Sequence, residues 1–293
     1  MMWAVPCFIM VTGALLLEPD KEISYKKLFG RYIFRVFMAI VIFGMLFRIF
    51  DMIMDAEKIS LSAFMTGFYE IFTGTGWSHM WYLYLIIGIY LLLPFYKKIV
   101  RYSSKRELCY LLAVYVIFLS ILPLFRIWDF SCGFYIHVST IYPFYLICGY
   151  AVYKNYLRIR PWQSALLAAV CTGLIIWFTV IRWQTDNQAL ESLWGYSSIL
   201  VVVQAVSIYS LAMRIKVRGF EKIKKVFTSI DTCSFGIYLV HMIYVRLLLR
   251  YMHVNPYEQG GFIAFAGIIV FIFILSYITV RALKKVPVFK SIL

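Results

Sequence analysis

Nine stretches of this chain are apolar over roughly the length that an α-helix needs to cross a bilayer. A helix rises about 1.5 Å per residue, so about 20 residues cover the ~30 Å hydrocarbon layer. A shorter apolar segment, LSAFMTGFYEIF at 61–72, lies in a long connection, and we expect it to form an interfacial helix. The nine predicted spans are, approximately, 1–17, 32–50, 80–96, 108–125, 139–153, 163–181, 193–213, 230–250 and 260–280.

Composition supports a membrane protein. Hydrophobic residues make up 63% of the 293 residues and charged residues 15%, whereas soluble domains are about 45–50% apolar and about 25% charged. These values exclude a soluble globule and a disordered chain. A transmembrane barrel would show alternating segments of about 10 residues instead. The sequence therefore predicts an all-α fold: a polytopic transmembrane helical bundle, with residues 1–293 as one membrane domain in the cell membrane.

The cysteines give no sign of a metal centre or a disulfide framework. None form a CxxC pair, and no histidine lies at metal-ligand spacing from them. We expect them to be small packing residues, and only Cys132 falls in a loop that we place outside. The six cysteines are Cys7, Cys109, Cys132, Cys148, Cys171 and Cys233.

Lysine and arginine are distributed unevenly among the connections between spans. Twenty-three of the 29 basic residues lie in alternate connections and the tail, whereas the other connections hold acidic residues and few cations. Because short cytoplasmic loops carry an excess of Lys and Arg, this pattern predicts a multi-pass protein with a cytoplasmic C-terminus. The charges form no continuous basic face, which argues against a nucleic-acid partner. The basic segments are 21–35, 97–106, 154–160, 214–225 and 281–290.

The same alternation places the N-terminus of this chain outside. The opening segment, MMWAVPCFIMVTGALLL, lacks the basic flank and the small-residue cleavage site of a signal peptide. One explanation is that a further helix precedes Met1 in the complete fold, which would then have ten spans. The alternative is a nine-span protein whose N-terminus is outside.

A histidine lies about half-way along the predicted span 230–250. Ser234, Tyr238, His241 and Val245 share one helix face, so a Ser–Tyr–His stripe is expected to point into the bundle. Ionisable residues at membrane depth are costly and are often functional. Two interpretations stay open for His241: a neutral imidazole held by one interhelical hydrogen bond, or a general base in contact with substrate.

A second histidine, His79, precedes span 80–96 and is surrounded by aromatic residues. An aromatic belt at the membrane interface would explain this pattern without a function. The functional interpretation is a platform on which Trp81 and Tyr82 stack against a sugar, beside an imidazole able to take a hydroxyl proton.

Arg31 and Arg35 lie four residues apart at the start of the second predicted span. Arginines at this position usually anchor a helix on its cytoplasmic side. The functional interpretation is a clamp for a phosphorylated donor, because the guanidinium group is planar and always charged.

The remaining polar residues near the spans are expected to have structural roles. Charged residues three apart at a helix end form ion pairs, long arginine side chains snorkel to the interface, and a lone amide commonly bridges helices. We therefore predict ion pairs for Arg48–Asp51 and Arg126–Asp129, snorkelling for Arg246 and Arg250, helix bridging for Gln204, and solvated side chains for His137 and His253.

Several segments together resemble the integral-membrane acyltransferase 3 family. They follow the family's order along nearly the whole chain, from a Val-Pro helix and an inner arginine pair to a near-terminal Ser-x-x-Ile-Tyr-Leu-x-His motif. The segments are WAVPCFIMVTGALLL (3–17), KKLFGRYIFRV (26–36), SHMWYLYLIIGIYLLLP (78–94), SFGIYLVH (234–241) and KKVPVFK (284–290).

The resemblance implies transfer of an acyl group, often acetyl, from a cytoplasmic coenzyme A thioester to a hydroxyl of a cell-envelope carbohydrate or glycolipid. Acyl-CoA would be a donor substrate, with no bound cofactor and no metal. Residue by residue, Arg31 and Arg35 match the family's donor-handling pair, and His79 and His241 match its histidines. We take these two histidines as catalytic candidates. The substrate-binding candidates are Arg31, Arg35, Trp81, Tyr82, Ser234 and Tyr238.

Two features depart from the family pattern. Thr12 stands where Ser is usual, and the family's first helix, whose Arg and His are regarded as central to catalysis, has no counterpart here. We therefore interpret the chain as truncated at its N-terminus relative to the family. Two other functions stay open: a transporter or flippase for a polar or lipid-linked solute, suggested by His241 and Gln204, and a non-catalytic scaffold, suggested by the missing helix.

Overall fold

A computed structural model describes residues 2–58, 60–128, 133–134, 136, 140–185, 188–215, 221–255 and 260–293. Regular structure in these residues is helical, and they contain no strand, which confirms the all-α prediction. The expectations for some loop residues concern positions outside the described ranges, namely Asp129, Cys132, His137 and two residues of the basic segment 214–225, Lys216 and Arg218.

Seven helical segments in the described residues are long and apolar enough to cross a membrane. The two other predicted spans form shorter apolar helices, α1 (Ala4–Leu16) and α7 (Tyr142–Tyr153). The segment predicted as a short separate helix forms α4 (Leu61–Thr73). The seven long segments are Tyr25–Met54, Leu61–Tyr102, Lys105–Phe125, Pro161–Thr185, Ser192–Ala212, Lys224–Tyr251 and Gly261–Leu283.

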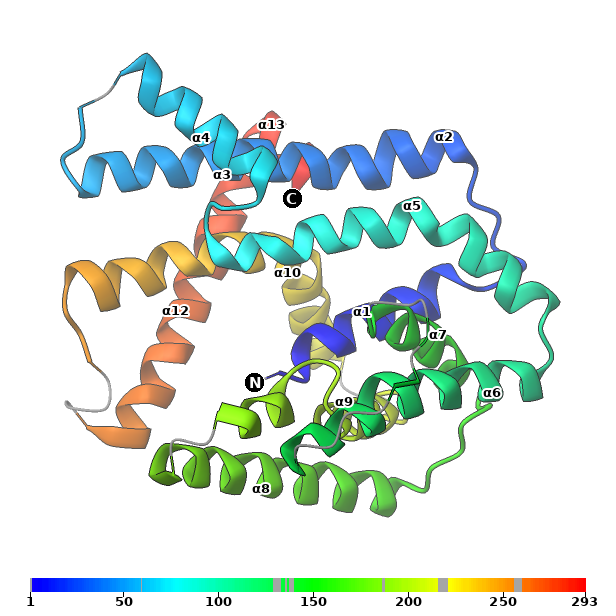
Figure 1. The fold of residues 1–293 in the computed structure, drawn as a ribbon. Helices are drawn as coiled ribbons and strands as arrows, with labels where there is room; N and C mark the ends of the chain where they lie inside the picture. Colours follow the sequence, from blue (N-terminus) through cyan, green and yellow to red (C-terminus); the bar gives the residue numbers. More distant parts are fainter. Residues whose placement is uncertain are drawn as a thin grey trace. The chain divides into compact units, whose positions relative to one another are not determined.

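The helices form two compact units, each made from two parts of the chain (Figure 1). Helix α5 (Trp81–Tyr102) belongs to unit 2 up to Leu91 and to unit 1 from Leu92. Unit 1 also contains α1, α6 (Lys105–Val116), η3 (Ile117–Ile121), η4 (Leu122–Trp128), α7, α8 (Pro161–Thr185), η5 (Gln188–Trp194) and α9 (Ile199–Ala212). Unit 2 also contains α2 (Tyr25–Lys27), η1 (Leu28–Ile33), α3 (Phe34–Met54), α4, η2 (Ser78–Met80), α10 (Glu221–Arg246), η6 (Leu247–Tyr251), α12 (Gly261–Leu283) and α13 (Pro287–Ile292).

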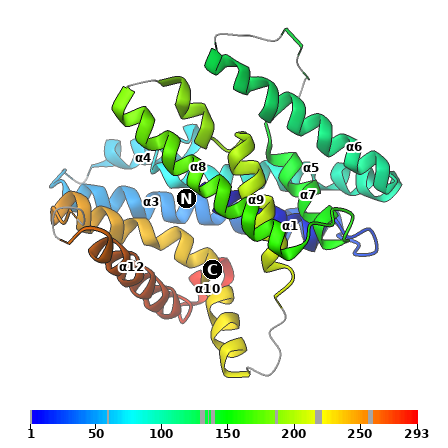
Figure 2. The same ribbon diagram turned by 90° about the horizontal axis from the view of Figure 1, so that it is seen from below.

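In unit 1, α1 and α7 lie side by side with their backbones almost touching (Figures 1 and 2). A Cβ atom added to Gly13 would lie 1.8 Å from the Leu146 carbonyl oxygen, and one added to Gly149 would lie 2.1 Å from that of Met10. Small residues let helices in a membrane approach this closely. The glycines therefore set the spacing of α1 and α7.

Polar contacts in unit 1 tie helices together. Gln204 on α9 donates to the Thr172 hydroxyl on α8 at 2.7 Å, which confirms that Gln204 bridges helices. The Lys97 ammonium donates to the carbonyl oxygens of Glu18 and Lys21, both at 2.7 Å. These bonds hold the chain that leaves α1 against α5.

In unit 2, α4 folds back onto α3, and the two helices lie side by side in both views (Figures 1 and 2). Gly74 ends α4 in the left-handed conformation, at φ 70°, which glycine adopts without strain. The chain then enters the short η2 turn, and the Tyr84 hydroxyl of α5 donates to the Ile71 carbonyl of α4. This path brings the η2 turn next to Phe47, a core residue of α3 that is 1% exposed.

Candidate active site

The two histidines singled out in the sequence lie next to each other in unit 2. His79 is in the η2 turn and His241 is in α10, and their ring centroids are 5.7 Å apart at an interplanar angle of 81°. Both residues are half-buried. The tertiary fold thus combines two separate candidates into one imidazole pair.

The His241 ring has a defined tautomer. Its Nδ1 atom lies 2.6 Å from the Tyr238 carbonyl oxygen and 3.2 Å from the Ile237 carbonyl oxygen. A carbonyl oxygen only accepts hydrogen bonds, so Nδ1 carries the proton and donates it. In the neutral ring, Nε2 then has a free lone pair, which is what a general base needs.

The His79 ring is held by packing. Both ring nitrogens are buried without a hydrogen-bond partner among the described residues. The Leu239 backbone is near the ring, but it makes no hydrogen bond of normal geometry with it. The rings of Phe47, Tyr238 and Trp77 surround the imidazole at centroid distances of 5.3, 5.7 and 5.9 Å. Since buried polar groups normally have partners, the hydrogen-bonding capacity of both nitrogens is unused in this arrangement.

Tyr238 connects the two histidines. Its hydroxyl donates to the His79 carbonyl, and its own carbonyl accepts from the His241 ring. The predicted substrate contact Tyr82 lies against Tyr238 at 5.6 Å between ring centroids. The contacts of the other two candidates differ: Trp81 is 36% exposed and meets Tyr82, and the Ser234 hydroxyl donates to the Asp231 carbonyl of its own helix.

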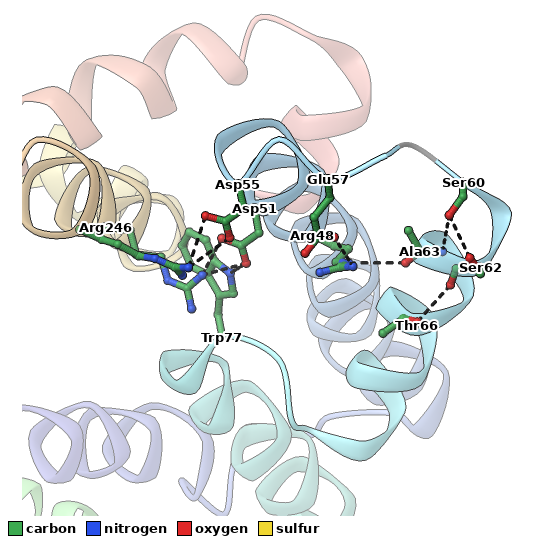
Figure 3. Close-up of polar contacts among 11 residues, drawn as sticks. Arg48, Asp51, Asp55, Glu57, Ser60, Ser62, Ala63, Thr66, Trp77 and Arg246 are labelled. Atoms are coloured by element: carbon green, nitrogen blue, oxygen red, sulfur yellow. Dashed lines mark hydrogen bonds and ion pairs between the residues drawn. The ribbon is translucent and has the colours of Figure 1, made fainter.

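A charged cluster includes Trp77, one of the aromatic residues around His79 (Figure 3). The Arg246 NH1 atom bonds to both Asp51 carboxylate oxygens, at 2.6 and 2.8 Å. The Trp77 Nε1 atom donates to the same carboxylate at 2.7 Å. Sequence reasoning did not find this cluster, because Arg246 and Asp51 are 195 residues apart.

This cluster corrects two predictions about ion pairs and snorkelling. Arg48 does not pair with Asp51; it reaches Glu57 at 2.7 Å (Figure 3). Arg246 and Arg250 do not simply snorkel, because they pair with Asp51 and Asp55 across two helices. A cation from a neighbouring helix can contact both oxygens of one carboxylate, and such paired contacts are stronger than single ones. The Arg126–Asp129 prediction involves a residue outside the described part of the chain. His253 is exposed.

The second feature of unit 2 is a cationic cavity of about 670 Å³. Arg31 and Arg35 both line it, so the predicted pair shares one surface. The segment after α12 adds Lys284 and Lys290 to the same lining, and the described lining residues include no acidic side chain. The basic segment KKVPVFK is visible in the sequence, but only the fold shows that it meets the arginine pair.

Arg35 is anchored within this cavity. Its Nε atom donates to the Ile292 carbonyl oxygen at 2.6 Å, and its NH2 atom donates to a main-chain oxygen of Leu293, the last residue of the sequence, at 2.7 Å. Its guanidinium also lies 5.2 Å from the centre of the Phe235 ring. A guanidinium has five N–H donors, so Arg35 can hold these carbonyls and still bind a phosphate oxygen. Neither His79 nor His241 is among the described lining residues of the cavity.

Together these features define a multi-pass helical membrane protein in which one unit holds both a half-buried histidine pair and a cationic cavity. A family model described as an acyltransferase domain matches residues 1–281 of the 293. The chain therefore belongs to the acyltransferase 3 family. No curated protein and no solved structure matches it.

Proposed function

We propose that this protein is an O-acyltransferase that moves an acyl group, in the first instance acetyl, from acyl-CoA to a hydroxyl of a cell-envelope carbohydrate or glycolipid. The adjacency of His79 and His241 in a member of an acyltransferase family carries the proposal. The choice of a carbohydrate as the acceptor rests on the aromatic residues next to this pair, because aromatic rings can stack against a sugar.

In the proposed reaction, His241 Nε2 takes the proton of the acceptor hydroxyl as the hydroxyl oxygen attacks the thioester carbonyl carbon. A C–O bond forms, the C–S bond breaks, and the proton passes from His241 to the leaving thiolate. The products are an ester and a free thiol, so no further reactant is needed. A His79 N–H donates to the oxyanion that forms during attack, which is the kind of contact that stabilises such intermediates.

The cationic cavity would bind the phosphates of the donor. The cavity lining combines two planar guanidinium groups with two compact ammonium groups. They belong to Arg31, Arg35, Lys284 and Lys290. Both contributing segments belong to the basic connections that the charge pattern predicts in the cytoplasm, where acyl-CoA is found. The proposed topology therefore has the donor entering from the cytoplasm and the acceptor from the opposite side.

The test is transfer of labelled acetyl from acetyl-CoA to envelope material by membranes that contain the full chain. His241→Gln should lower the transfer rate about 10²- to 10⁴-fold, because the base is lost. The matched control is His253→Gln, which removes an exposed histidine and should keep wild-type activity.

Absence of transfer to any envelope fraction by the wild-type chain would refute the enzyme proposal. Solute uptake that continues without coenzyme A would support a transporter. If His241→Gln and His253→Gln both kept full activity, acyl transfer would stand but His241 would not be its base.

A further inference from the structure

We propose that Asp51 is a positioning residue: it holds Trp77 and Arg246 as a fixed wall that orients the His79 ring. For its kinetic consequence the inference rests on the proposed function. The geometric claim stands on the contacts alone and can be tested without acyl transfer.

Each of the three wall residues, Asp51, Trp77 and Arg246, contacts the other two. Asp51 accepts hydrogen bonds from Trp77 and Arg246, and the Arg246 guanidinium lies 4.0 Å from the centre of a Trp77 ring (Figure 3). Trp77 is 7% exposed, and a cation over an indole face is attractive. Each residue is therefore restrained from two directions.

The wall reaches His79 through stacked rings. Trp77 and Phe47 are parallel within 10°, with centroids 4.3 Å apart, and both contact the His79 ring. Since neither His79 nitrogen has a hydrogen-bond partner of normal geometry in the described chain, no such bond fixes the ring there. The orientation of the imidazole depends on its aromatic neighbours, and the indole among them is fixed by Asp51.

A second ion pair on the same two chain segments provides a matched control. Asp55 and Arg250 each lie four residues after Asp51 and Arg246, and they pair at 3.2 Å. This pair is more open, because the Arg250 side chain is 55% exposed against 28% for Arg246. Arg250 lies over the Tyr251 ring, and the Phe50 ring lies between Tyr251 and Trp77.

The experiment compares Asp51→Asn with Asp55→Asn in the full chain in membranes. The first readout is acetyl-transfer kinetics, and the second is carbethoxylation of His79 by diethyl pyrocarbonate, measured by mass spectrometry and normalised to the exposed His253. We expect Asp51→Asn to lower kcat about tenfold with an unchanged KM for acetyl-CoA, because misoriented catalytic groups lose rate at unchanged donor binding. His79 modification should accelerate about tenfold, because its nitrogens become more accessible. This factor corresponds to a decrease of about 1.4 kcal/mol in the free energy needed to expose them. Asp55→Asn should change neither readout, and Asp51→Glu should restore both in part.

Modification of His79 at the wild-type rate in Asp51→Asn would overturn the proposal, and so would equal effects of the two aspartate variants. If Asp51→Asn does not fold, Trp77→Phe takes its place, since it removes the Nε1 donor and keeps a smaller aromatic ring. Wild-type labelling in Trp77→Phe would also count against the wall. If the wild-type protein transfers no acetyl group, the proposed function fails, and the labelling result alone decides whether Asp51 positions His79.

Discussion

Units 1 and 2 differ in the chemistry of their interiors. Unit 1 is joined by close backbone contact at Gly13 and Gly149, and its cavity of about 390 Å³ has an almost wholly apolar lining. Unit 2 contains the histidine pair, the Asp51 cluster and the cationic cavity. Both units are built from apolar helices, so hydrophobicity alone does not separate them.

The difference indicates where the chemistry is. Ionisable groups inside apolar helices are costly unless they have a partner or a function. Unit 2 contains such groups at the histidine pair with the adjoining Asp51 cluster, and at the cationic cavity. Unit 1 links α8 and α9 through an amide and a hydroxyl, Gln204 and Thr172, and its Lys97 and Lys154 contacts lie at Glu18, after the end of α1. We therefore expect substitutions in unit 2 to change the reaction and substitutions in unit 1 to change stability.

Beyond His241→Gln, the largest expected effect in a comparison of the two units is that of His79→Phe. This change keeps an aromatic ring and removes both nitrogens, so kcat should fall about hundredfold if His79 stabilises the oxyanion. The measurement is acetyl transfer per folded molecule. In unit 1, Tyr145→Phe removes the hydrogen bond from a buried hydroxyl to the Tyr196 carbonyl and should leave kcat unchanged. A loss of rate in Tyr145→Phe as large as that in His79→Phe would contradict the division between the units.

Gly149→Ala should mainly affect stability. The new methyl group would overlap the Met10 backbone, and overpacking of this kind costs about 1–3 kcal/mol. Unfolding in detergent should show the loss, while the rate per folded molecule stays at the wild-type value. Gly173→Ala on α8 is the control, because its Cβ meets nothing within 4 Å. Equal stability of the two variants would show that α1 and α7 are not in close contact.

Arg35→Lys should weaken donor binding while keeping the charge. The ammonium group cannot hold the two carbonyls and a phosphate with a planar fork, so KM for acetyl-CoA should rise about tenfold, and kcat should change little. Arg158→Lys, an exposed position in unit 1, is the control. A fall in kcat at unchanged KM would place Arg35 outside the donor site.

The smallest expected effect is that of Gln204→Leu. It removes one interhelical hydrogen bond, and such bonds in membrane proteins average about 0.6 kcal/mol. Unfolding should show a small loss of stability, with acetyl transfer unaffected. Loss of acetyl transfer in this variant would show that unit 1 takes part in the reaction.

Sequence patterns predicted the helical class and most of the spans, because hydrophobic length is a local property of the chain. They also singled out His79, His241, Arg31 and Arg35, since ionisable residues are rare inside apolar segments. They did not predict that the histidines meet. Nor did they give the partners of Asp51, because the choice between a residue three positions away and one on another helix depends on how the helices pack.

Tyr238 fixes the histidine pair from both sides, through its hydroxyl on His79 and its carbonyl on His241. A sliding motion of α10 would therefore move the His241 ring directly and pull on the backbone that carries His79. The position of this helix and the geometry of the imidazole pair are thus linked. A small molecule that bridges both rings would also restrain α10.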